Sequence, residues 1–157
     1  MATKSPSLFE AVAADGRPLL QLTAFALLFS GCFAFFVSIR REFLPHDIAY
    51  LAMRPDQLCA LAECRVVAFM FHDRVAFGGV LIAIAILYFW LTAVPLGDGA
   101  AWAWWTIVIS GAIGFLSFLS YLGHGYLDTW HGVGSFALVP MFLAGVVRSH
   151  ALVRTGP

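Results

Sequence analysis

The stretch VAFGGVLIAIAILYFWLTAV, Val75–Val94, is 20 consecutive residues without a charged side chain. At about 1.5 Å of rise per residue, a helix of this length crosses a hydrocarbon core of about 30 Å. Three further apolar stretches occur along the chain: Leu19–Ile39, Trp102–Leu122 and Gly132–Val147. We therefore predict four transmembrane helices.

Composition supports this prediction. Hydrophobic residues make up 61% of the 157-residue chain and charged residues 11%, and the mean hydropathy is +0.87. Soluble domains are about half apolar and about a quarter charged, so an ordinary water-soluble domain is excluded. The formal net charge is zero and no run of Lys or Arg occurs, which argues against nucleic acid as a partner. The predicted surroundings are the lipid bilayer.

The predicted fold class is all-α: a four-helix transmembrane bundle forming one domain over residues 1–157. One long polar connection, Arg40–Arg65, joins the first and second helices. Neither Gly nor Pro occurs from Asp56 to Phe77, so the second helix is expected to extend N-terminally toward Pro55, with a break near Arg65 as the alternative. Four spans place both termini on one side of the membrane. Lys and Arg are divided five to four between the two faces, so the positive-inside rule predicts no orientation.

Two local patterns concern packing. Small residues recur at every third position of the third span, and we expect this stripe to pack against the second or fourth helix; it comprises Gly111, Gly114, Ser117, Ser120 and Gly123. Cys32 is expected to be a small buried residue. Cys59 and Cys64 point to different sides of a helix, so a disulfide between them requires that the segment is not helical.

In a four-span chain, the first and third connections lie at the same membrane face, which gathers eight polar residues there: His46, Asp47, His72, Asp73, Arg74, His124, Asp128 and His131. Ionisable groups at membrane depth cost about 2.5–3.5 kcal/mol each, so they usually face a partner or a cavity. Adjacent helical residues point about 100° apart, so His72, Asp73 and Arg74 cannot all face one way.

Arg74 is expected to pair with Asp73 or Asp128, or to belong to an interfacial ring of charges that sets the depth of the helix. His46 and Asp47, which follow Leu44-Pro45, are interpreted as a loop turn, with a lid over the cluster as the alternative.

A metal site is one hypothesis for this cluster. His124 would end the third helix, His131 would begin the fourth, and His72 would complete a three-histidine set. Three imidazoles with carboxylates suit zinc or non-haem iron, and two opposed histidines can instead ligate haem. Asp73 and Asp128 would then act as general acid or base groups, or would orient the histidines.

The functional hypothesis that follows is hydrolytic or redox chemistry on a lipid-soluble substrate. The contrasting hypothesis is a non-enzymatic accessory or scaffold subunit, in which the polar cluster joins helices or docks a membrane-protein partner or a second copy of the chain. Proton or ion transport is a third, weaker hypothesis, because the middles of the first and fourth spans contain no ionisable residue.

Overall fold

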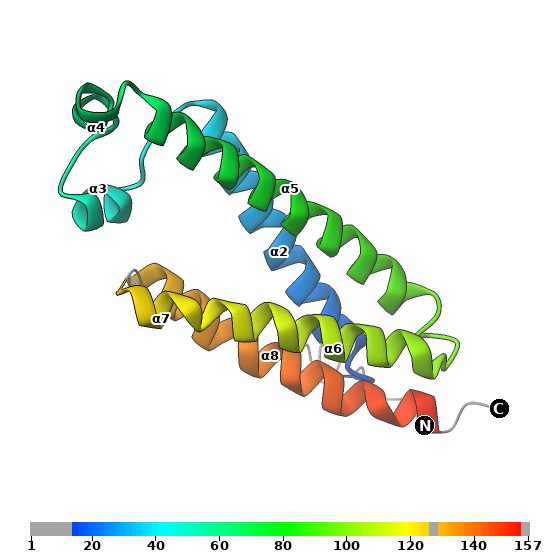
Figure 1. Cartoon of the computed structure of the whole chain (residues 1–157). Helices are drawn as coiled ribbons and strands as arrows, with labels where there is room; N and C mark the ends of the chain where they lie inside the picture. Colours follow the sequence, from blue (N-terminus) through cyan, green and yellow to red (C-terminus); the bar gives the residue numbers. More distant parts are fainter. Residues whose placement is uncertain (1–13, 126–128, 155–157) are drawn as a thin grey trace, which may run out of the picture. The chain divides into compact units, whose positions relative to one another are not determined.

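The computed structural model describes residues 14–125 and 129–154 (Figure 1). The chain is 83% helix, and no strand occurs among the described residues. The all-α prediction is therefore confirmed.

Among the described residues, four helices are long and apolar enough to cross a membrane: α2 (Arg17–Ile39), α5 (Arg65–Ala93), α6 (Ala101–Phe118) and α8 (Thr129–Arg154), in which the apolar segment is Gly132–Arg154. The same part of the chain forms three short helices between them: α3 (Pro45–Leu51), α4 (Pro55–Ala62) and α7 (Ser120–His124). The predicted number of apolar helices is confirmed, but several boundaries differ.

The second long helix does not extend back to Pro55. Glu63 and Cys64 have positive φ angles of 47° and 58°, which end α4 and separate it from α5. Figure 1 shows α4 as a separate short helix that leads into α5. The predicted continuous helix is wrong at this point, and the alternative of a break near Arg65 is confirmed.

The ends of the third and fourth helices differ from the prediction as well. The third helix ends at Phe118 and is followed by α7, whereas the predicted span ran to Leu122. The fourth continues to Arg154, beyond the predicted end at Val147. It continues because its polar residues have partners: an Arg148 guanidinium nitrogen donates to the Ala14 carbonyl at 3.1 Å, and the buried Ser149 hydroxyl donates to the Val146 carbonyl at 3.2 Å.

The chain divides into two compact units. One is Leu27–Ala85, which contains the C-terminal part of α2, the helices α3 and α4, and most of α5. The described residues before Leu27 and after Ala85 form the second unit, which contains α6, α7 and α8.

In the Leu27–Ala85 unit, two glycines allow α2 and α5 to approach at backbone distance. A Cβ atom placed on Gly78 would lie 2.8 Å from the Gly31 carbonyl oxygen and 3.1 Å from the Phe35 nitrogen. Small residues are the usual basis of such close helix pairs in apolar surroundings. Cys32 is exposed, so the expectation of a buried thiol is wrong. Gly31 faces α5, and the next residue on a helix points about 100° away.

A small apolar core in the same unit lies between the start of α5 and the segment that connects α2 to α5. Phe43, Val67 and Phe71 form its buried centre, and the rings of Phe43 and Phe71 are 5.5 Å apart. The partly buried residues that pack against this centre are Ile48, Leu51, Leu58, Cys59 and Met70. Helices α3 and α4 are thus held by apolar contacts to the first turns of α5.

In the second unit, α6 packs against α8 around Gly111. A Cβ atom on Gly111 would collide with the ring of Phe142, and the Trp104 indole donates to the Val146 carbonyl at 3.0 Å. The predicted packing of the small-residue stripe is confirmed at Gly111. At Gly114 and Gly123, however, an added Cβ would meet no atom within 4 Å. The packing face is therefore narrower than the stripe.

Replacing Gly78 by Ala is expected to destabilise the protein by about 1–3 kcal/mol, because the new methyl group forces two helix backbones apart. Gly79→Ala is the matched control, since a Cβ at Gly79 meets nothing within 4 Å. Thermal unfolding followed by circular dichroism in mild detergent measures both variants. Equal stability of the two would contradict the close approach of α2 and α5.

The pair Gly111→Ala and Gly114→Ala tests the contact between α6 and α8 in the same way. The first should lower the unfolding temperature because Phe142 must leave its position, and the second should leave it unchanged. Tryptophan fluorescence offers a second measurement, because Trp104 lies in the same contact. A loss of stability in Gly114→Ala alone would show that α6 packs through another face.

Candidate functional site

The polar site of the Leu27–Ala85 unit begins at the N-terminus of α3. Pro45 occupies the first turn, where its missing N–H is not needed, and Asp47 is the third helical residue. The Asp47 carboxylate accepts a hydrogen bond of 2.7 Å from the Leu44 backbone N–H. In a capping box, the side chain of the third helical residue accepts a hydrogen bond from the backbone N–H of the N-cap residue, and Asp47 makes this bond. Leu44-Pro45-His46-Asp47 is therefore a helix start, and its interpretation as a loop turn is wrong.

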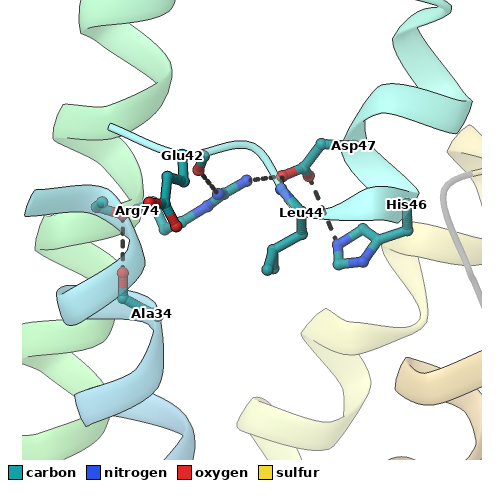
Figure 2. A network of polar contacts seen from close by, with 7 residues as sticks. Ala34, Glu42, Leu44, His46, Asp47 and Arg74 are labelled. Atoms are coloured by element: carbon teal, nitrogen blue, oxygen red, sulfur yellow. Dashed lines mark hydrogen bonds and ion pairs between the residues drawn. The ribbon is translucent and has the colours of Figure 1, made fainter. Parts of the chain in front are cut away.

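Arg74 of α5 binds the same carboxylate. Its Nη2 donates to Asp47 Oδ2 at 2.7 Å, and its Nη1 donates to the Glu42 carbonyl oxygen at 3.4 Å. The Asp47 side chain is 1% exposed and the Arg74 side chain 18%. Figure 2 shows the Asp47 carboxylate between the Arg74 guanidinium and the His46 ring. Arg74 thus pairs with a residue 27 positions earlier in the chain and not with the predicted Asp73. The other predicted partner, Asp128, lies outside the described residues.

His46 lies on the other side of this carboxylate. Its Nε2 is 3.5 Å from Asp47 Oδ1, and its side chain is 18% exposed. A protonated imidazole would add a positive charge to the network, and a neutral ring would contribute at most a long polar contact. Both carboxylate oxygens of Asp47 thus face donors from α3, α5 or the chain before α3.

This arrangement is suited to joining helices. A buried carboxylate must be paired and hydrogen-bonded, because an isolated buried charge is strongly unfavourable. Asp47 meets that requirement, and among the residues that the structure describes no buried side-chain nitrogen or oxygen lacks a partner. The network therefore holds α3 against α5 and leaves no carboxylate oxygen facing solvent.

His72 and Asp73 differ from Arg74 in their environment. Their side chains are 78% and 57% exposed, and His72 Nδ1 lies 3.3 Å from Asp73 Oδ1. Only Arg74 of this tripeptide faces inward, which confirms that the three residues cannot share one direction. The exposed pair is a carboxylate beside an imidazole, an arrangement that can orient a histidine or bind a polar group from another molecule.

The other predicted site residues belong to the second unit. His124 is the last residue of α7 and is exposed, and His131 lies in the first turn of α8. Asp128 lies outside the described residues, as does the placement of the His131 side chain. His131 lies at the start of the fourth long helix, as predicted, whereas His124 ends the short helix α7 and not the third long helix, which ends at Phe118. The joint role of both residues with His72 stays a prediction.

The predicted metal site concerns His, Cys, Asp and Glu side chains that lie close together. Within residues 14–125 and 129–154, no group of three or more such side chains is placed so that it could hold a metal ion. The predicted metal site of His72, His124 and His131 with Asp73 and Asp128 stays a hypothesis, because Asp128 and the His131 side chain lie outside the described part of the chain.

Sequence reasoning missed the pairing of Asp47 with Arg74. Pro45 followed two residues later by a carboxylate, and then by the apolar Ile48, carries a recognisable signal for a helix start with an N-terminal acidic cap. A short helix that begins this way presents its carboxylate at a known position. Its cationic partner on α5, Arg74, cannot be predicted from the local sequence, because the two residues are 27 positions apart in the chain.

In comparisons with known proteins, no family model matches this chain, and no curated protein or solved structure does so either.

Replacing Asp47 by Ala is expected to cost about 2–5 kcal/mol of stability, since Arg74 would be left largely buried without its anion. Glu42→Gln is the control, because the Glu42 side chain joins Arg40 in a pair that is more than half exposed. Exposed pairs of this kind contribute about 0–1 kcal/mol. Denaturant unfolding in mild detergent measures both variants.

The double variant Asp47→Asn/Arg74→Gln completes the measurement. Its loss of stability should be smaller than the sum of the losses in the single variants Asp47→Asn and Arg74→Gln, because the double variant leaves neither charge unpaired. Strict additivity would show that the two side chains do not depend on each other.

Proposed function

We propose that this chain is a four-span integral membrane protein that serves as a non-enzymatic accessory or scaffold subunit. In this proposal the Asp47–Arg74 network holds the polar connection in place, and the neighbouring exposed polar pair, His72–Asp73, docks a membrane-protein partner or a second copy of the chain. The proposal has three supports: the exposed apolar faces, the buried network and the exposed pair.

The apolar faces support insertion in a bilayer. Less than a third of the residues in each apolar helix window are buried inside the chain. Large side chains such as Phe29, 66% exposed, and Phe136, 83% exposed, point away from it. Exposed apolar area on this scale is unfavourable in water and is the normal surface of a helix that contacts lipid.

The buried network is the observation that carries the proposed role. The Asp47 side chain is 1% exposed, and its carboxylate accepts hydrogen bonds from the Leu44 backbone N–H and the Arg74 guanidinium. Its hydrogen-bonding groups are thus engaged within the chain and do not face a substrate. Polar residues at membrane depth are expensive unless they pair, and pairs of this kind fix the register of neighbouring helices. The network thus supports a structural role for the cluster.

The exposed pair supports docking. His72 and Asp73 lie two and one positions before Arg74 on α5, and their side chains are 78% and 57% exposed. A carboxylate and an imidazole near the N-terminal end of an apolar helix can hydrogen-bond a polar group of another membrane protein, and that pairing offsets the cost of desolvating them. The inward Arg74 fixes the turn of α5 that presents them.

The second candidate function is a metal- or haem-dependent hydrolase or oxidoreductase acting on a lipid-soluble substrate. The observation that favours it is the contact of 3.3 Å between His72 Nδ1 and Asp73 Oδ1, since carboxylates often orient metal-binding histidines in this way. In this alternative His72, His124 and His131 bind zinc, iron or haem, and Asp73 and Asp128 hold or move protons. A bound zinc would supply hydroxide at neutral pH, and haem or iron would supply redox chemistry.

The test is made on protein without a histidine tag, extracted from its own membranes in mild detergent. We expect a native mass well above the 17.1 kDa of one chain, and far less than one iron or zinc per chain. The double variant His72→Ala/Asp73→Asn should fall to a smaller mass while it keeps its helix content. Glu63→Gln/Arg65→Gln is the matched control, because that pair is also exposed, at 81% and 86%, and lies at the start of α5.

Two results decide against the scaffold role. A monomeric native mass in the unaltered protein removes the docking proposal. Near-stoichiometric iron or zinc that is lost in His131→Ala supports the metal-dependent alternative instead.

A further inference from the structure

A disulfide closes the polar connection between α2 and α5. Cys59 lies in the last turn of α4, Cys64 follows the end of that helix, and the two sulfur atoms are bonded. The backbone N–H groups of Glu63 and Cys64 both donate to the Cys59 carbonyl, at 3.2 Å in the case of Cys64. The chain thus turns sharply at this point, and the condition set by the sequence, a non-helical segment between the cysteines, is met.

The turn has no other evident cause in the local sequence. Glu63 and Cys64 are successive residues with positive φ, a region that residues other than glycine adopt at a cost. Neither Gly nor Pro occurs from Asp56 to Phe77. Without the disulfide, the residues of α4 and α5 favour one continuous helix. The covalent bond is therefore the constraint that keeps these helices apart.

The disulfide joins the apolar core of the Leu27–Ala85 unit to its surface. Cys59 is partly buried and packs against the core formed by Phe43, Val67 and Phe71, whereas Cys64 is exposed. Both cysteines line a cavity of about 310 Å³, together with Val67, Ala68 and Phe71. Opening the bridge is therefore expected to affect both the turn and the contact of Cys59 with the core.

Disulfides of this structural kind persist in oxidising compartments and are rare where glutathione and thioredoxin keep thiols reduced. We propose that residues 40–64 lie on the oxidising, non-cytoplasmic side of the membrane, so that both ends of the chain face the cytoplasm. This inference rests on the proposed four-span insertion, because the order of the spans along the chain then places the two ends opposite the first connection.

Charge does not oppose this orientation. The face of the first connection carries Arg40, Arg41, Arg54, Arg65 and Arg74, and the face of the termini carries Lys4, Arg17, Arg148 and Arg154. Arg74 of α5 is paired with the buried Asp47 of α3, so it does not act as a free charge of the loop. Four cations then remain on each face, and the positive-inside rule favours neither orientation. The disulfide supplies the asymmetry that charge lacks.

The first part of the test counts thiols in a Cys32→Ala variant of the full chain. Intact cells are quenched in acid, and the denatured protein is treated with a maleimide mass tag before or after reduction. We expect no tag before reduction and two after it. Cys59→Ser in the same background is the control, with one tag under both conditions. Two tags before reduction would overturn the proposal.

The second part places reporters at the C-terminus of the full chain in a bacterial host. A green fluorescent protein fused there should fluoresce, and an alkaline phosphatase fused there should be inactive, because the phosphatase folds only after export. An active phosphatase with a dark fluorescent protein would overturn the orientation.

A carbonate wash of the same membranes at about pH 11 separates this inference from the function on which it rests. A chain that stays in the pellet but carries an active C-terminal phosphatase contradicts the orientation alone. A chain that the wash releases contradicts the four-span proposal, and the orientation with it.

Discussion

The ion pair between Arg74 and Asp47 is the constraint around which the Leu27–Ala85 unit is arranged. Burying the Asp47 carboxylate requires a cation and further donors at fixed positions, because a buried anion without them is strongly unfavourable. Arg74 of α5 supplies the cation, and the backbone N–H of Leu44 supplies a further donor. One contact thus fixes the place of α3 against a long helix.

Other features of the unit follow from that position. With α3 fixed, Phe43 and Ile48 lie where they pack against Val67 and Phe71 of α5. The same core receives Cys59 from α4, and the disulfide then ends α4 at the turn before α5. Polar, apolar and covalent contacts therefore act on one short segment, residues 40–64, whose own helices have only seven and eight residues and would not be stable alone.

The long helices are held by a different principle. Gly31 and Gly78 bring two backbones together in one unit, and Gly111 accepts the ring of Phe142 in the other. In the proposed bilayer, apolar side chains gain nothing by leaving lipid for protein, so close packing at small residues replaces hydrophobic burial as the source of helix association. In that bilayer, large exposed side chains such as Phe29 and Phe136 would contact lipid.

The predicted site shows where sequence reasoning works and where it stops. His72, Asp73 and Arg74 drew notice because charged residues are rare next to a long apolar run, and their divergence on a helix was predictable from geometry. Their partners were not. Arg74 was expected to bind Asp73 or Asp128, yet it binds Asp47, because an ion pair depends on distance in space and three carboxylates are compatible with the sequence.

Chain composition and the length of the apolar runs are sufficient to predict four long helices, since an apolar run of about 20 residues is the length of a membrane-spanning helix. Helix geometry also predicts that Cys59 and Cys64 can form a disulfide only where the helix is interrupted between them. The break itself depends on the bond between Cys59 and Cys64, and the burial of Asp47 and the narrow glycine contacts depend on residues far apart in the chain. They arise from packing and pairing in three dimensions, where a covalent bond or a buried charge outweighs the local preference for one continuous helix.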